Sequence, residues 1–142
     1  MNMMSALSRQ RPRSVDDTEA RLSGMIEYLR SVVLGDPGRA ERFHAVFLDR
    51  DRRYVGDSPL GLGNATTLTL RMRDLFGRAL AVGANAIIVA HNHPSGHCQP
   101  SKRDIDATGR LATIAAALDI ELLDHLIFTR DAVYSMRAGG DL

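Results

Sequence analysis

A short apolar run that ends in a histidine pair, residues 85–93, constrains the fold more than any other part of the chain. An apolar run of this length, between Gly83 and a Pro/Gly loop, predicts a buried central β-strand over residues 85–91. Side chains two positions apart on a strand leave the same face. His91 and His93 therefore point the same way at the strand's end, where two imidazoles can bind one metal ion.

Apolar residues recur at helical spacing in three other segments. The first helix is expected over residues 15–34 and the second near 69–82, where Gly83 ends it. A third helix begins at Ser101. The side of this third helix that we expect to face inward carries Ile105, Leu111, Ile114, Ala115 and Leu118.

Four further segments have the composition of β-strands. The first is apolar on both faces, which indicates burial on both sides, and the glycine-rich residues 59–64 that follow the second are predicted to form a loop. Helices that alternate with strands predict an α/β or α+β fold, with a single mixed β-sheet flanked by helices. The four predicted strands are residues 41–49, 54–58, 120–129 and 132–136.

The length of 142 residues suits one domain with a single core. Residues 1–13 carry no apolar periodicity, so we expect a disordered tail followed by a domain over residues 14–142. The apolar stretches are too short for a membrane span, and a single cysteine cannot form an internal disulfide. We therefore expect a cytoplasmic protein with no membrane partner.

The charge balance gives little sign of a surface dedicated to nucleic acid. The chain has 18 basic and 17 acidic residues, and three of the arginines lie in residues 1–13, so the remainder carries 15 basic against 17 acidic residues. Nucleic-acid-binding domains usually show a strong basic excess. Arginines within residues 50–53 and 71–78 could form a local patch, but solvated turn and helix faces are the simpler interpretation.

A third potential ligand follows the histidine pair. Seven residues separate His93 from Ser101, and Asp104 then lies in the first turn of the predicted helix, where its carboxylate can reach back toward the strand end. Two histidines and one aspartate leave a fourth tetrahedral position for water, as in catalytic zinc sites. Ser101-x-x-Asp104 is also a capping-box pattern, so both residues could serve only the helix N-terminus.

The order His-x-His, seven residues, Ser, two residues and Asp resembles the JAMM motif of the MPN-plus/JAB metalloproteases. The sequence HNHPSG…PSKRDI resembles that of the RadC branch of this group, and the similarity runs from about Glu41 to the C-terminus. The resemblance implies a fold similar to the cytidine-deaminase-like sandwich and a zinc ion held by His91, His93 and Asp104. It also implies that Glu41 acts on the zinc-bound water and that Ser101 hydrogen-bonds the developing oxyanion.

The function implied by this resemblance is zinc-dependent hydrolysis of an amide bond in a peptide or an isopeptide-linked protein conjugate. Zinc lowers the pKa of its bound water toward about 7, and Glu41 would pass a proton from that water to the leaving amine. Two alternatives stay open. One is a DNA-associated repair accessory protein or nuclease, which suits the RadC name and the basic tail, and the other is a scaffold that keeps the fold without turnover.

Four residues near these motifs have no assigned role. His97 and Cys98 could be alternative soft ligands, or they could belong to an exposed loop. Asp124 and His125 match a Leu-Asp-His motif of RadC-like proteins. They could form a structural pair on a strand, or they could contact the metal site from outside the ligand set.

Overall fold

The computed structural model describes residues 15–35, 40–64, 68–69 and 71–142. The predicted tail, residues 1–13, lies outside this part of the chain, so the boundary at residue 14 stays a prediction. No helix within the described residues is long and apolar enough to cross a membrane. In chain order the elements are α2 (Val15–Leu34), β1 (Glu41–Leu48), β2 (Tyr54–Gly63), α4 (Met72–Ala81), β3 (Ala86–Asn92), α5 (Lys102–Ala117), β4 (Glu121–Phe128) and β5 (Val133–Ser135).

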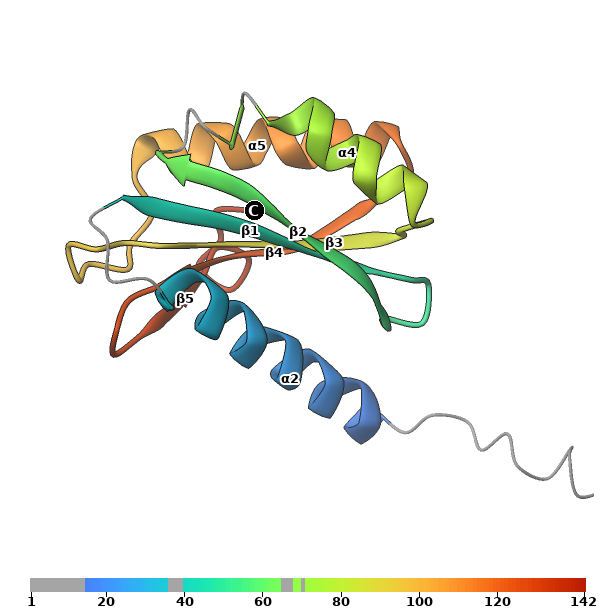
Figure 1. The fold of residues 1–142 in the computed structure, drawn as a ribbon, viewed down its shortest axis with the longest axis horizontal. Helices are drawn as coiled ribbons and strands as arrows, with labels where there is room; N and C mark the ends of the chain where they lie inside the picture. The colour runs from blue at the N-terminus through green and yellow to red at the C-terminus, as the bar shows by residue number, and fades with distance from the viewer. Residues whose placement is uncertain (1–14, 36–39, 65–67, 70) are drawn as a thin grey trace, which may run out of the picture.

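The strands form a five-stranded sheet in the order β2-β1-β3-β4-β5. β1 runs antiparallel to β2 and β3, and β4 runs antiparallel to β5, whereas β3 and β4 are parallel. Parallel neighbours need a crossover connection, and α5 supplies it between β3 and β4. Figure 1 shows α4 and α5 over one face of the sheet and α2 across the other. The prediction of one mixed sheet flanked by helices is therefore confirmed.

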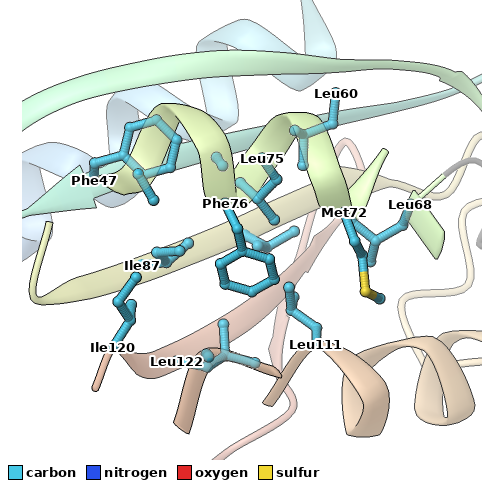
Figure 2. Packing of buried hydrophobic residues seen from close by; sticks show 14 of the residues in the cluster. Phe47, Leu60, Leu68, Met72, Leu75, Phe76, Ile87, Leu111, Ile120 and Leu122 are labelled. Atoms are coloured by element: carbon cyan, nitrogen blue, oxygen red, sulfur yellow. The ribbon is translucent and has the colours of Figure 1, made fainter. Parts of the chain in front are cut away.

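Alternating side chains on β3 divide the core into two clusters. Ile87 and Val89 lie on the face under α4 and α5, in one cluster with Phe47, Leu75 and Leu111. Figure 2 shows how side chains from the sheet, α4 and α5 meet in this layer. Because β3 is buried at all seven of its positions, the prediction of a buried central strand is confirmed.

The opposite face of β3 packs against α2. Met25, Leu29 and Val33 follow one another at four-residue spacing and are buried, as the periodicity of residues 15–34 predicts. They share a cluster with Ile88 of β3 and Phe128 of β4. α2 is thus an amphipathic helix that covers the face of the sheet away from α5.

β2 is longer than predicted. The loop expected for residues 59–64 is wrong, because the strand continues to Gly63. β2 lies at the edge of the sheet, where Pro59 costs no ladder hydrogen bond that a central strand would need. Its pairing with β1 is irregular at Phe43/His44, and Gly61 adopts a φ of 104° that favours glycine. The glycines that suggested a loop instead accommodate an irregular edge strand.

The inward face of α5 is rotated from the predicted one. Leu111 and Ala115 are buried as predicted, but the face also contains two polar side chains, Asp104 and Thr108. Residue 105 lies about 100° further round the helix than residue 104, so pointing Asp104 inward turns its neighbour outward. Three residues predicted to face inward are instead 37% to 39% exposed: Ile105, Ile114 and Leu118.

The other predicted elements lie close to their expected bounds. The helix expected over residues 69–82 is observed as α4, which begins at Met72 after a turn at Arg71. The strands expected at residues 120–129 and 132–136 are β4 and β5.

A hydrogen-bonded cluster centred on Asp57 joins α2 to the outer strands. The Asp57 carboxylate of β2 accepts hydrogen bonds from Tyr28 of α2 at 2.6 Å, from His44 of β1 at 2.6 Å, and from the hydroxyl of Tyr54. Burial alone would raise the pKa of Asp57, but the hydrogen bonds from Tyr28, Tyr54 and His44 outweigh it and lower the pKa. The cluster therefore stabilises the fold in the ionised form of Asp57.

Asp57→Asn is expected to lower the free energy of unfolding by about 1–3 kcal/mol near pH 7, because it removes the charged acceptor. A carboxyl whose pKa is lowered in the folded state contributes stability above its unfolded pKa and loses it as the pH falls through the folded pKa. The deficit should therefore shrink at acidic pH. Urea denaturation at a series of pH values measures it.

Asp74→Asn is the matched control for this change. Asp74 makes an exposed ion pair with Arg78 of the same helix, at 3.4 Å. Exposed pairs of this kind contribute little to stability, so the control should unfold like the wild type at every pH. A deficit of Asp57→Asn that stayed constant down to the lowest pH would contradict the role given to its charge.

Candidate metal centre

His91 occupies the buried end of β3. It follows Ile87 and Val89 on the face toward α5, and it is fully buried. Its ring stacks on Phe43, its register partner in β1, with the ring centroids 4.6 Å apart and the planes at 18°. The strand period and this stacking together fix the plane of the His91 imidazole.

Glu41 lies beside the histidine pair because of the antiparallel register of β1 and β3. Phe43 pairs with His91, so Glu41, two residues earlier, lies level with His93. The Glu41 Oε1 atom is 3.7 Å from His93 Nε2. Asn92 extends the pairing to this end of the strands, since its Oδ1 atom accepts a 2.7 Å hydrogen bond from the backbone N–H of Arg42.

The capping box of α5 aims the Asp104 carboxylate at the histidines. Ser101 is the N-cap, and its Oγ atom accepts the backbone N–H of Asp104 at 3.0 Å, while the Ser101 N–H donates to Asp104 Oδ2 at 2.9 Å. The same carboxylate places Oδ2 3.1 Å from His93 Nε2 and Oδ1 3.4 Å from His91 Nε2. The capping alternative and the metal-site alternative are therefore compatible, because the cap orients the candidate ligand.

One ligand atom from each of Glu41, His91, His93 and Asp104 lies within 4.8 Å of the other three. The two histidine Nε2 atoms are 3.0 Å apart, close to the separation of about 3.3 Å between two ligand atoms of a tetrahedral zinc ion. In the form that would bind a metal, with both carboxylates ionised and both ring Nε2 atoms unprotonated, the four side chains carry a charge of −2, which a divalent cation balances. The residues present therefore fit a divalent metal ion that prefers nitrogen and oxygen ligands.

Hydrogen bonds outside the cluster leave the Nε2 atom of His93 free for a metal. His93 Nδ1 is 2.7 Å from the backbone carbonyl of His97, which can only accept. The proton of a neutral His93 ring is therefore on Nδ1, and the lone pair is on Nε2. The carbonyl of His97 thus contributes to the site, while its exposed imidazole does not.

The charges of the cluster shift the pKa values of its members. Burial raises the pKa of Glu41, and the negative charge of Asp104 adds to this rise, although the two imidazoles oppose it. A hydrogen bond to Asp104 raises the pKa of His93. In the metal-free cluster, burial alone would raise the pKa of Asp104, but hydrogen bonds from Nε2 of His91 and His93, whose protons a bound metal would replace, outweigh it and hold the pKa well below its usual range. A raised pKa suits Glu41 to proton transfer near neutral pH.

Three other residues noted in the sequence, His97, Cys98 and Asp124, lie outside the metal-capable cluster found among the described residues. Asp124 has a structural position, because its carboxylate accepts hydrogen bonds from Ser135 and from the backbone N–H of Arg137, which join β4 to the C-terminal segment.

His125 has a different position from Asp124. It is fully buried, and its Nε2 atom lies 2.7 Å from His91 Nδ1. Burial lowers the pKa of His125 well below its ordinary value, so the ring is neutral. The sequence analysis did not identify Asn92, and it left two roles open for His125. The Leu-Asp-His motif does not indicate which face of β4 His125 occupies.

Comparison with known proteins places these residues in a family. A family profile described as the RadC-like JAB domain matches residues 20–141. A UPF0758 protein of Paraburkholderia xenovorans (strain LB400) is 34% identical over 140 residues, which cover 99% of this chain and 53% of that protein. A UPF0758 protein of Trichodesmium erythraeum (strain IMS101) is 39% identical over 97 residues, covering 68% of this chain and 40% of the relative.

A third relative, from Aquifex aeolicus (strain VF5), is a UPF0758 protein that is 38% identical over 104 residues, covering 73% of this chain and 45% of that protein. The chain thus spans about half the length of these relatives or less. The family profile nevertheless covers most of the chain and includes every residue of the metal-capable cluster. The chain therefore belongs to the RadC-like JAB domain family.

Proposed function

We propose that this domain is a zinc-dependent hydrolase of amide bonds, with His91, His93 and Asp104 as the metal ligands. The convergence of these three side chains and Glu41 at one end of the sheet carries the proposal. Their nitrogen and oxygen atoms are donors that zinc accepts, and three protein ligands are typical of catalytic zinc sites. When bound, zinc would act as a Lewis acid that makes water more acidic and polarises a carbonyl group.

Glu41 is the proposed general base. Its carboxylate is at the border of the cluster, 3.7 Å from His93, and its side chain keeps 26% of its surface exposed. In this position Glu41 can accept a proton from the attacking water and return it to the nitrogen of the leaving amine. The rise in its pKa brings the protonated form closer to neutral pH, as the second transfer needs.

Ser101 is the proposed donor to the oxyanion. Its Oγ atom accepts the N–H of Asp104 and thereby keeps its own hydroxyl proton available. Ser101 is exposed at the start of α5, beside the ligand that it orients. The hydroxyl can therefore donate a hydrogen bond to the carbonyl oxygen of a bound amide as negative charge develops there.

The exposure of the cluster indicates where a substrate would enter. The side chains of His91 and Asp104 are 0% and 2% exposed, whereas those of His93 and Glu41 are 10% and 26% exposed. The site is thus closed toward the core and open on the side of Glu41. We propose that a peptide or an isopeptide-linked protein conjugate approaches from that open side.

The structure adds little support for DNA as the partner. Two arginines from the basic clusters make ion pairs, Arg52 with Glu121 at 2.6 Å and Arg78 with Asp74 at 3.4 Å. Pairing lowers the charge that these side chains would offer to phosphates.

The single cysteine, Cys98, is a free thiol, which supports the proposal of a reducing cytoplasmic location.

The test is hydrolysis by the zinc-loaded chain. We expect about one zinc per chain, and cleavage of at least one member of a panel of linear peptides and isopeptide-linked conjugates. In water labelled with oxygen-18, the new carboxyl group should contain one labelled oxygen, detected by mass spectrometry. Removal of the metal with a chelator should stop the cleavage, and added zinc should restore it.

Two other results would favour the alternatives. A zinc-loaded chain that cleaves no member of the panel would favour the scaffold. Salt-dependent binding to DNA, without amide cleavage, would favour the DNA-associated protein, because neutralised phosphates release counterions.

A further inference from the structure

We propose that His125 is a positioning residue, which sets the tautomer and orientation of His91 for metal binding. His125 comes from β4, the parallel neighbour of β3, and lies outside the ligand cluster. The proposal rests on the metal site described above, but not on its catalytic activity. It gives a role to His125, whose ring contacts His91 and Thr108, whereas Asp124 of the same motif bonds to the C-terminal segment.

The two ring nitrogens of His91 face different partners. Nε2 lies in the cluster, 3.0 Å from His93 Nε2 and 3.4 Å from Asp104 Oδ1. Nδ1 points the other way, 2.7 Å from His125 Nε2. The two rings meet edge to face, at 65° and with centroids 4.8 Å apart. Only Nε2 of His91 is therefore placed to bind a metal ion.

His91, His125 and Thr108 then form a row of hydrogen bonds in which each side chain donates to the next. Metal binding needs the lone pair of His91 Nε2, so a neutral His91 ring carries its proton on Nδ1. This N–H donates to His125 Nε2, which must be unprotonated. His125 consequently carries its proton on Nδ1, where Thr108 Oγ1 accepts it at 2.7 Å. The Thr108 hydroxyl has its own weak acceptor, Met136 Sδ, at 3.6 Å.

Burial makes each hydrogen bond of this row hard to replace. His91 and His125 are fully buried and Thr108 is 1% exposed, so water cannot replace a lost partner. Asp104 and Thr108 are four residues apart on the same face of α5. One helix turn thus supplies both a candidate ligand and the group that ends the row.

An irregularity in β4 brings His125 to this face. Ile87 pairs with Leu122, but the next residue, Ile88, pairs with Asp124, so β4 contains one extra residue at this point. In a regular strand Leu122 and His125 would point to opposite faces. With the bulge, Leu122 packs in the cluster under α4 and α5, and His125 contacts His91 on that same side. β-bulges of this kind re-aim side chains, often next to functional sites.

The test compares two substitutions at His125. His125→Leu removes the acceptor for His91 and should weaken zinc binding by about 10- to 100-fold. In His125→Gln the side-chain amide oxygen is as many bonds from Cα as the imidazole Nε2, so it can accept the same hydrogen bond. This variant should keep its zinc affinity within about threefold of the wild type. Competition with a coloured chelator measures the affinity of each purified chain.

His44→Leu is the matched control. His44 is also a buried strand histidine, but it bonds to Asp57 on the α2 side of the sheet. Its replacement should lower stability and leave zinc affinity unchanged. Nitrogen-15 spectra of the zinc-loaded wild type give a second readout, in which we expect the His91 proton on Nδ1. This readout keeps the proposal testable if His125→Leu does not fold.

Two results would overturn the proposal. One is unchanged zinc affinity in a folded His125→Leu chain, and the other is a zinc-loaded wild type whose His91 proton is absent from Nδ1. Failure of the proposed function looks different. A chain that binds zinc but hydrolyses nothing would contradict the catalytic proposal, while the order of zinc affinities, with glutamine above leucine at position 125, would still support the role of His125.

Discussion

Asp104→Ala is expected to lose both the metal ion and the activity. The substitution removes a proposed ligand that contacts both histidines, at 3.1 Å and 3.4 Å. Loss of a residue that only supports a ligand costs about 10- to 100-fold in metal affinity, so the loss here should exceed 100-fold. The variant also lacks half of the capping box, which should lower stability by about 0.5–2 kcal/mol.

Zinc content after dialysis and the unfolding midpoint check both parts of this prediction. Asp106→Ala is the control, since Asp106 is an exposed acidic residue two positions along the same helix. It should keep its zinc and its stability. Full zinc retention by Asp104→Ala would exclude Asp104 as a ligand, whatever the effect on the helix.

Glu41→Gln should keep the zinc ion and lose most of the turnover. The amide has nearly the shape of the carboxylate but cannot accept a proton from water, and general acid–base groups contribute about 100- to 10,000-fold. Zinc content and the rate on any substrate found in the panel give the two readouts. The loss should appear in kcat as well as in kcat/KM, because the proton moves only during the reaction.

Glu121→Gln is the control for this prediction. Glu121 also opens a strand, but β4 begins at the opposite end of β3 from His91, and Glu121 is paired with Arg52. Its rate should equal that of the wild type. A fully active Glu41→Gln chain would remove Glu41 from the mechanism, and a metal-free one would make Glu41 a ligand.

The positions of the candidate ligands could be predicted because they depend on short-range rules. A period of two brings His91 and His93 to one face of the strand, and a four-residue capping pattern fixes Asp104 relative to Ser101. Both rules act over two or three neighbouring positions at the end of one element, so they depend little on tertiary packing. The buried strand β3 and the helix α2 were predictable for the same reason.

The predictions that were wrong or left open concern features that depend on packing between elements. Hydrophobicity favoured Ile105 and Ile114 as inward residues, but the polar contacts of Asp104 set the rotation of α5. The extension of β2 through Pro59 depends on its place at the sheet edge, which the sequence does not show. The face of His125 depends on one extra residue in β4, and no composition rule indicates such a bulge.

The β3–α5–β4 crossover has a consequence for how binding and turnover can be separated. Three candidate ligands and His125 all come from this one contiguous unit, residues 86–128, whereas Glu41 comes from β1, which pairs with the edge strand β2. The proposed metal ligands and the proposed base thus belong to two supersecondary motifs, which are joined by the pairing of β1 with β3. Because Phe43 of β1 stacks on His91 of β3, loosening of β1 would displace the proposed base and disturb the orientation of a candidate ligand at the same time. The proposed zinc binding and turnover can therefore be separated by substitution, but not by opening of the sheet.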